Sequence, residues 1–419
     1  MPYKAPRGTS DILPADQPYW HYIIQHAERL CRLYGYHRLD TPLFEDSGLF
    51  QRGIGEGTDI VEKEMYTFED KGGDRVTLRP EGTAPVARAY LEHGMHNLPQ
   101  PVKLYYIAPS FRYERPQAGR FRQFYQFGAE ALGETDPAID AEIIVLAAEF
   151  YRSIGLTGIR LLLNSIGDAN CRPQYLQALR DYFEPHVQEL CQDCQNRFER
   201  NTLRLLDCKQ PPDQARIHAA PKMVDYLCDE CRTHFAAVRL QLDTLEVPYT
   251  IEHRLVRGLD YYTRTVFEFV PAVEGSAQSA VGAGGRYDGL VEALGGKSTP
   301  GIGFGIGIER AVLKLKQQNV AVPDLSAPRV YVAYMGDAAK QSAVRLAHQL
   351  RQANVNTLIA TGDRSLRAQM RHANQMGVAW AVIIGEDEVA NGSAQLKDML
   401  GGEQMTVPLA EALHRLTGS

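Results

Sequence analysis

The sequence predicts a mixed α/β protein: an α+β core domain built on an antiparallel sheet and carrying a mostly helical insertion, followed by a C-terminal α/β domain. Two strand-like segments, Leu104–Tyr113 and Phe121–Glu130, alternate in character on either side of a charged loop. Residues from Cys171 to about Val247 are polar, helical in pattern and rich in cysteine. From Arg329 onward strand and helix patterns alternate, as in helices packed on a sheet.

Length and composition bound the class of protein. The 419 residues suffice for two or three domains with full cores, and 44% apolar with 23% charged residues is ordinary for a globular chain. No apolar run approaches membrane-spanning length and the start lacks a secretory core, so we expect a cytoplasmic protein without membrane contact. The net charge of −6 argues against a non-specific nucleic-acid coat but leaves room for a basic patch that binds RNA.

The N-terminal part predicts helices and strands in alternation. Pro18–Tyr34 has apolar residues at helical spacing and is followed by Gly35. Tyr36–Phe44 is strand-like, but its Pro42 belongs at an edge or an interruption. Arg75–Pro80 is a short strand that leads into a helix running to His93.

The start of that second helix has two interpretations. Thr83 fits the N-cap of this helix and Pro85 its first turn, so helix formation alone would explain these residues. Glu81 instead precedes the cap at the end of a strand, where ligands of a sheet usually approach. The glycine-rich, acidic segment Gly53–Met65 is expected to form a loop over a site.

The central hairpin predicts a polar surface. Alternation places Arg112, Gln126 and Glu130 on one side of the sheet. The alternative is a solvent-exposed hairpin, since one face of an antiparallel sheet is commonly wet. Arginine forks suit phosphate oxygens, and three arginines gather in and after the connecting loop: Arg115, Arg120 and Arg122.

The core domain continues around the insertion. We expect helices over Ala138–Ile154 and Ala311–Gln317, strands over Ile159–Ile166 and within Tyr249–Val270, and a tight glycine turn at Ala283–Asp288. The glycines Gly301, Gly303, Gly305 and Gly307 alternate with apolar residues, which is not the G-x-G-x-x-G of a dinucleotide loop. They predict a closely packed strand with room for a flat ligand or another backbone; the alternative is a plain core strand followed by a surface arginine.

The C-terminal part begins after residues 323–328, which have linker composition. Its expected order is strand Val330–Tyr334, helix Ala339–Gln352, strand Thr357–Ala360, helix Leu366–Met376, strand Trp380–Ile384, shorter elements and a closing helix.

The cysteines carry an open question. Seven cysteines in a chain expected to be cytoplasmic should be reduced. Cys191-x-x-Cys194 and Cys228-x-x-Cys231 would supply four thiolates with the spacing of a structural zinc site, with Cys208 between the pairs. The alternative is reduced cysteines in a helical core, because C-x-x-C also places two residues on one helix face.

The segment FRYERPQAGRFRQFYQFGAE, residues 111–130, closely resembles motif 2 of class II aminoacyl-tRNA synthetases, in the form carried by histidyl-tRNA synthetases. The first helix and its proline-bearing strand resemble motif 1, the dimer-forming element, and Gly301–Arg310 resembles motif 3. Leu255–Thr263 and Gly284–Leu290 resemble the two histidine-specific motifs. With Arg7-Gly8-Thr9, the resemblance spans essentially the whole chain in family order.

This resemblance implies a homodimer with a class II catalytic domain at residues 1–325, an insertion at about 171–247 and an anticodon-binding domain at 326–419. The histidine carboxylate would attack the α-phosphorus of ATP, giving histidyl-adenylate and pyrophosphate. The 3′-adenosine hydroxyl of tRNA(His) would then take the histidine and release AMP. Mg²⁺ is expected to bridge phosphate oxygens, although no all-protein magnesium cage is visible.

The resemblance also assigns the arginines. Bringing two anions together requires fixed positive charge. Arg112 and Arg257, the expected catalytic residues, would hold the α-phosphate and the amino-acid carboxylate, while Arg120 and Arg310 would hold the triphosphate tail. All four form the expected ATP-binding set.

Histidine selection falls to a second set. By resemblance, Glu130 and Tyr262 read the imidazole, Glu81, Thr83 and Gln126 hold the α-amino group, and Tyr287 lines the pocket. Gly82 and Tyr261 complete this expected histidine-binding set. The loop Glu114–Arg120 would meet the acceptor end of the tRNA, whose unpaired bases are readable.

Two rival functions remain. Some relatives keep the histidine-binding fold as regulatory subunits of the first enzyme of histidine biosynthesis, but they should have damaged arginines and no anticodon domain. The other rival is a class II synthetase for proline or threonine, against which the segment Arg257–Thr263 argues.

Overall fold

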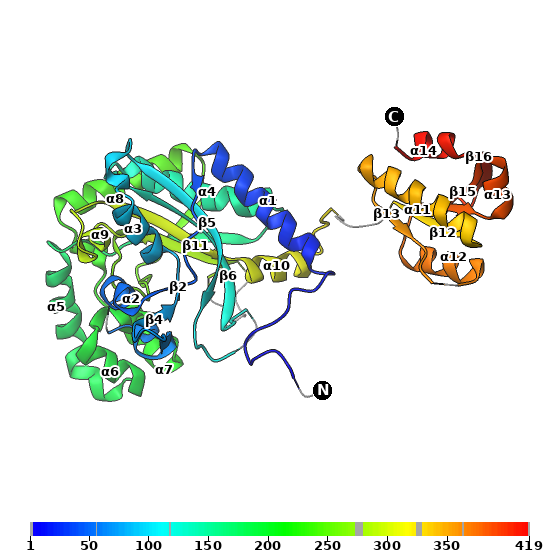
Figure 1. Ribbon diagram of the computed structural model, residues 1–419. Helices are drawn as coiled ribbons and strands as arrows, with labels where there is room; N and C mark the ends of the chain where they lie inside the picture. Colours follow the sequence, from blue (N-terminus) through cyan, green and yellow to red (C-terminus); the bar gives the residue numbers. More distant parts are fainter. Residues whose placement is uncertain are drawn as a thin grey trace. The chain divides into compact units, whose positions relative to one another are not determined.

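The computed structural model describes residues 3–55, 57–116, 119–272, 280–323, 329–362 and 364–417. The chain forms two compact units, Met1–Val322 and Pro323–Ser419, each with its own hydrophobic core (Figure 1). The linker-like residues 324–328 lie outside the described residues. No described helix is both long enough and apolar enough to cross a membrane.

The first unit is organised around an eight-stranded sheet with the order β1-β5-β6-β11-β10-β9-β7-β8. The outer pairs β1/β5 and β7/β8 are parallel and all the others antiparallel, so the predicted antiparallel core is confirmed. In this order the strands are His37–Arg38, Val102–Phe111, Gln123–Leu132, Gly301–Gly307, Gly282–Arg286, Thr263–Pro271, Ile159–Ser165 and Tyr249–Ile251. A smaller antiparallel sheet has the order β2-β4-β3, made by Phe44–Asp46, Arg75–Leu78 and Tyr66–Glu69.

The helices of the first unit fall before, within and after the insertion. Before it come α1 Gln17–Leu33, α2 Ser47–Ile54, α3 Thr83–Glu92 and α4 Pro137–Ser153. The insertion holds α5 Arg172–Phe183, α6 Gln192–Arg200, α7 Pro211–Ala219 and α8 Asp229–Thr244, which confirms its helical character. After it come α9 Leu290–Ala293 and α10 Ile308–Gln317.

The two faces of the sheet serve different purposes. On β6, Phe127, Ala129 and Ala131 belong to the main core, which they share with α1, α4, α8 and α10 (Figure 1). The intervening residues Gln126 and Glu130 point to the opposite face, as alternation along a strand requires. The main hydrophobic core therefore lies on one side of the sheet, and the polar side chains of β6 lie on the other, next to a smaller apolar cluster that includes Leu104 and Tyr106.

The central hairpin has the predicted pairing with slightly shifted ends. β5 and β6 run antiparallel, with Leu104 opposite Glu130 and Phe111 opposite Gln123. Arg112 lies just beyond β5, where its backbone N–H donates to the carbonyl of Arg122 at 2.9 Å. In the loop predicted over Glu114–Arg120, residues 117 and 118 lie outside the described part of the chain.

One prediction about the core domain is wrong. The expected turn at Ala283–Asp288 is mostly strand β10, paired with both β9 and β11. A Cβ at Gly284 would lie 2.2 Å from the carbonyl oxygen of Gly303, so the glycine permits close strand packing and does not form a turn. The expected strand Tyr36–Phe44 is interrupted around Pro42, as its proline predicted, and only His37–Arg38 as β1 and Phe44 as the start of β2 are paired.

The second unit is a five-stranded sheet with the order β13-β12-β14-β15-β16. β12 pairs in parallel with both β13 and β14, whereas the pairs β14/β15 and β15/β16 are antiparallel. Their bounds are Thr357–Ile359, Val330–Tyr334, Trp380–Ile384, Ser393–Asp398 and Gln404–Pro408. The helices are α11 Asp337–Gln352, α12 Leu366–Gln375, α13 Glu386–Asn391 and α14 Leu409–Thr417, so the predicted α/β alternation is confirmed.

Candidate active site

A cavity of about 1000 Å³ opens on the polar face of the large sheet. Its walls include parts of α3, β5, β6, β9, β10, β11 and α10, the segment between β8 and β9, and the insertion. The four arginines expected from separate segments all line it: Arg112, Arg120, Arg257 and Arg310. Guanidinium groups that are far apart in sequence therefore share one concave space.

Glu130 lies behind the cavity wall and is fully buried. Its carboxylate accepts hydrogen bonds from the hydroxyls of Tyr287 at 2.6 Å and Thr83 at 2.8 Å, and from that of Tyr106 at 3.4 Å. Burial raises the pKa of Glu130 to about 8, although the hydroxyl donors favour its charged form. The hydroxyls hold this carboxyl in place, and its raised pKa brings its titration close to neutral pH.

The glycine strand β11 makes room for this carboxyl. A Cβ at Gly303 would lie 1.7 Å from a Glu130 carboxylate oxygen, and one at Gly301 would lie 2.3 Å from the Tyr287 ring. At these two positions the expected room is taken by side chains and not by a flat ligand. Further along the strand, Gly305 and Gly307 line the cavity itself.

Glu81 caps helix α3, which corrects the expectation that Thr83 is the N-cap. The N-cap is Gly82, and the Glu81 carboxylate accepts from the backbone N–H groups of Thr83 at 2.6 Å and Ala84 at 2.8 Å. Burial raises the pKa of Glu81, while these N–H groups lower it. A Cβ at Gly82 would lie 2.2 Å from the Tyr106 ring, so a larger residue would displace this cap.

Three tyrosines join the two carboxyls. The ring centroid of Tyr261 lies 4.7 Å from that of Tyr262 and 5.8 Å from that of Tyr287. The Tyr261 hydroxyl is 3.5 Å from Glu81, and Tyr261 and Tyr262 line the cavity. Burial raises the pKa of all three phenols, so they stay protonated and can donate.

Arg257 has a hydrogen-bond donor that no described residue of the protein accepts. It forms an ion pair with Glu268, and its guanidinium carbon lies 5.7 Å from the centre of the Tyr262 ring. Its Nε is buried and has no partner among the described residues. A buried donor without a partner costs free energy unless a ligand satisfies it.

The other arginines are held by backbone oxygens or by one carboxylate. Arg112 Nε donates to the carbonyl of Pro80 at 2.8 Å, and Arg310 Nε to that of Gly119 at 2.8 Å. Arg120 pairs with Glu114 at 3.3 Å. Burial and the neighbouring charges of Arg120 and Arg112 lower the pKa of Arg310, while Glu114 raises it. An anion bound here would relieve the repulsion among these cations.

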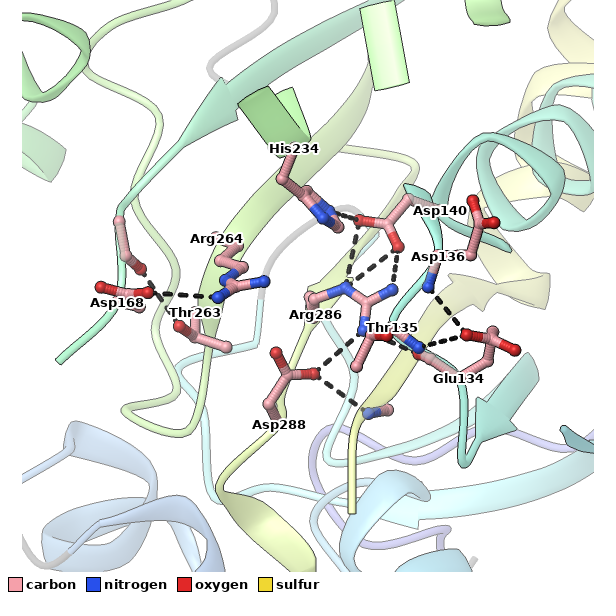
Figure 2. A network of polar contacts seen from close by, with 12 residues as sticks. Glu134, Thr135, Asp136, Asp140, Asp168, His234, Thr263, Arg264, Arg286 and Asp288 are labelled. Atoms are coloured by element: carbon pink, nitrogen blue, oxygen red, sulfur yellow. Dashed lines mark hydrogen bonds and ion pairs between the residues drawn. The ribbon is translucent and has the colours of Figure 1, made fainter. Parts of the chain in front are cut away.

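A second polar network, whose Arg286 and Asp140 are not among the residues that line the cavity, supports the sheet (Figure 2). Arg286 is fully buried and forms an ion pair with Asp140, to which His234 is hydrogen-bonded at 2.9 Å. Nη1 of Arg286 donates to Asp288 at 3.1 Å and to the carbonyl of Glu134 at 3.0 Å. The network ties β10 to α4 and α8, so this arginine of a histidine-specific motif is structural.

The predicted site residues divide into two layers. Glu130 and Tyr287 lie behind the wall and Gly82 shapes the cap, while the remaining predicted side chains line the cavity: Glu81, Thr83, Arg112, Arg120, Gln126, Arg257, Tyr261, Tyr262 and Arg310. Sequence reasoning missed Tyr106 and Glu268, although Tyr106 shares the strand face of Arg112. It also missed insertion residues such as Arg197 and Lys209, which local sequence could not place beside the sheet.

The predicted zinc site with four thiolates from both C-x-x-C pairs is wrong in its grouping. Cys191 and Cys194 lie with Cys208 and Asp213, whereas Cys228 and Cys231 lie with Cys171 and Asp168. Within each group, one ligand-type atom per residue lies within 4.8 Å of all the others. The insertion folds the two pairs into separate clusters, because each pair begins a different helix.

Comparisons with known proteins agree along the whole chain. The family model described as "Histidyl-tRNA synthetase" matches residues 8–311, and the one described as "Anticodon binding domain" matches residues 329–418. The second match runs against the regulatory rival, which predicted that such a domain is missing.

Individual relatives give the same result. A histidine–tRNA ligase of Dehalococcoides mccartyi is 54% identical over 98% of both chains, and one of Desulforamulus reducens is 50% identical over 97% of both. The crystal structure of apo S. aureus histidyl-tRNA synthetase is similar with a TM-score of 0.83 and 39% identity, covering 99% of this chain and 100% of that one. The chain therefore belongs to the histidyl-tRNA synthetase family of class II aminoacyl-tRNA synthetases.

Proposed function

We propose that the protein ligates L-histidine to tRNA(His) at the expense of ATP, through histidyl-adenylate. The observation that carries this proposal is the convergence of four arginines on one cavity beside buried carboxyl and phenol groups. Two anions, the histidine carboxylate and the α-phosphate, repel each other until fixed cations neutralise them. The cavity supplies those cations without solvent having to reorganise.

Arg257 and Arg112 serve the reacting centre. The Nε of Arg257, which has no partner in the described part of the chain, and the cavity-facing Arg112 bind the α-phosphate and the attacking carboxylate. Arg120 and Arg310 bind the outer phosphates, where burial and then the charges of the neighbouring arginines lower the pKa of Arg310. Charge that builds on the phosphate oxygens in the transition state is met by donors already in place.

Mg²⁺ fits the oxygen donors beside these arginines. Glu114 and Glu309 line the cavity and offer carboxylate oxygens, the ligand type that Mg²⁺ prefers. Burial raises the pKa of Glu309 to about 7. A cation bound nearby would counteract this shift and favour the charged carboxylate. The ion would neutralise phosphate charge, and the phosphates and water would supply its other ligands.

Histidine is selected by hydrogen bonds. Its imidazole offers a polar group on each edge, which suits Glu130 on one side and the Tyr262 phenol on the other. Glu81, Thr83 and Gln126 hold the α-amino group, with Gly82 fixing the cap and Tyr261 and Tyr287 positioning the carboxyls. An analogue without the ring nitrogens leaves buried groups unpaired, so its kcat/KM should be lower than that of histidine by roughly 10⁴-fold or more.

Transfer to tRNA uses both units. The loop after β5, with Arg115, meets the acceptor end beside the cavity, and the second unit at 326–419 binds the anticodon. Basic residues on its helices and just before α12 provide phosphate contacts: Lys340, Arg345, Arg351, Arg364, Arg367 and Arg371. The protein works as a cytoplasmic homodimer through its first helix and strand, with residues 1–325 as the catalytic domain.

The experiment that tests the proposal is aminoacylation of tRNA(His) with labelled histidine. We expect acid-precipitable label that requires ATP and Mg²⁺ and is absent with a tRNA of another identity. Ligation of another amino acid to its own tRNA, with none of histidine, would contradict the proposal.

A further inference from the structure

We propose that the protein carries two structural zinc sites, one held by Asp168, Cys171, Cys228 and Cys231 and the other by Cys191, Cys194, Cys208 and Asp213. Six of the seven cysteines of the chain belong to these clusters. The proposal concerns the fold and does not depend on the proposed reaction.

The second cluster has the geometry of a tetrahedral site. A tetrahedron of Zn–S bonds about 2.3 Å long has S–S edges of roughly 3.8 Å. The sulfurs of Cys191 and Cys208 are 3.8 Å apart. Sulfur and oxygen ligands of the same ion should lie roughly 3.5 Å apart, and Cys208 Sγ lies 3.2 Å from the carboxylate of Asp213.

The first cluster repeats this geometry. Cys171 Sγ lies 3.5 Å from Asp168 Oδ1, and Cys228 Sγ lies 3.9 Å from the same oxygen. In both clusters three sulfurs surround one carboxylate, which is the donor set of a Cys₃Asp site. Three thiolates with a single carboxylate favour Zn²⁺ over Mg²⁺ or Ca²⁺, which require oxygen ligands.

The two clusters also share their construction. Cys191 is the N-cap of α6 and Cys228 the N-cap of α8. The second cysteine of each pair, Cys194 or Cys231, lies in the first turn and is buried. A helix N-terminus stabilises negative charge, so each pair is placed to become two thiolates.

Ordinary packing of reduced cysteines explains these clusters poorly. Asp213 is fully buried and lies among three sulfurs, although a buried carboxylate is costly unless it is paired or bound to a metal. The 3.8 Å between the Cys191 and Cys208 sulfurs is far longer than the roughly 2.05 Å of a disulfide. A cation at the centre accounts for both the buried carboxylate and the close sulfurs.

Groups around each cluster contact the proposed ligands and would hold them in position. Arg264 lies 3.3 Å from the second oxygen of Asp168, which offsets the negative charge of the ligand set (Figure 2). The backbone N–H of Asp168 donates to Cys171 Sγ at 3.4 Å, and that of Gln210 to Cys208 Sγ at 3.4 Å. Such N–H to sulfur contacts hold thiolates in place.

The sites would brace two walls of the cavity. Next to Cys171, Arg172 donates to the backbone carbonyl of Tyr262 at 2.8 Å. In the second cluster, Cys191 and Cys208 themselves line the cavity. The metals therefore stabilise the insertion where it meets the histidine-specific segment and take no part in the chemistry.

The direct test is metal analysis of the full-length protein purified without chelators, before and after incubation with a slight excess of Zn²⁺ and gel filtration. We expect about two zinc ions per chain. Cys194→Ser and Cys231→Ser should each retain about one, the double variant none, and the control Cys31→Ser, at a buried cysteine outside both clusters, about two. Wild-type protein that holds no zinc after this incubation would overturn the proposal.

Cobalt substitution tests the ligands on wild-type protein, so the proposal stays testable if a variant fails to fold. Exchange of zinc for Co²⁺ should give intense near-ultraviolet absorption from thiolate-to-metal charge transfer and visible bands of tetrahedral Co²⁺, at about two ions per chain. Bound cobalt with neither feature would show coordination without thiolates and would contradict the assigned sites.

Discussion

Two arginines from the two histidine-specific segments behave in opposite ways. Arg286 is fully buried, and two carboxylates and a backbone carbonyl of its own chain satisfy it. Arg257 faces the cavity, pairs with Glu268 and leaves its Nε without a partner among the described residues. A guanidinium completed by the fold is structural, whereas one left with a free donor in a cavity is available to a ligand.

The largest effect should come from Arg286→Ala. Removing this cation leaves the buried Asp140 with its hydrogen bond to His234 but without the arginine that neutralises it, which costs about 3–5 kcal/mol of stability. Calorimetry should show the first unit unfolding at a clearly lower temperature. Arg152→Ala, at the solvent-exposed pair with Glu149, is the matched control and should unfold like wild type. Equal unfolding temperatures for the two variants would remove the structural assignment of Arg286.

Arg257→Ala should act on catalysis more than on folding. Losing a cation aimed at the transition state should slow histidine-dependent ATP–pyrophosphate exchange by roughly a hundredfold or more. Arg257→Lys keeps the charge but loses the planar fork, so we expect an intermediate rate. An unchanged exchange rate in the alanine variant would show that Arg257 is misassigned.

A smaller effect should follow Gly303→Ala. The added methyl group would lie 1.7 Å from Glu130 and 2.7 Å from a backbone oxygen of β6, so we expect about 1–3 kcal/mol of destabilisation and a raised KM for histidine. Gly307→Ala on the same strand meets nothing closer than 3.7 Å and should leave the unfolding temperature near that of wild type. Similar unfolding temperatures for both variants would argue against the crowding around Glu130.

The last prediction concerns pH. The pKa of Glu130 is about 8 in the fold against 4.5 for an ordinary glutamate, so the folded state binds the extra proton. Its contribution to stability is fully present below about pH 4.5 and is lost as the pH rises to about 8. Without histidine, wild type should therefore lose more stability than Glu130→Gln between pH 5 and 8, by unfolding midpoint. Parallel profiles would mean that Glu130 is not protonated in the fold.

Alternation in the sequence was enough to find the sheet and its polar face. The hairpin around β5 and β6 followed from alternation along its strands, whereas Val330–Tyr334 and Trp380–Ile384 are continuous apolar runs, as is usual for parallel strands buried on both faces. The glycines of β10 led to the wrong prediction of a turn, because a run of small residues is typical of turns. Here the glycines allow two neighbouring strands to pack closely against β10, which the local sequence does not show.

The long-range parts of the site could not be predicted from local pattern. Nothing near Glu81 shows that its carboxylate rather than Thr83 caps α3. The division of the cysteines into two clusters depends on how four helices of the insertion pack, which C-x-x-C spacing does not specify. The same spacing therefore singled out cysteines that lie in clusters but grouped them with the wrong partners.

The most direct test of the account is ATP–pyrophosphate exchange by the wild-type protein with single amino acids. The gathered arginines and the polar pocket predict exchange with L-histidine and none with L-proline or L-threonine. Exchange driven by either of those amino acids, or none with histidine in the presence of Mg²⁺, would contradict the assignment of this cavity.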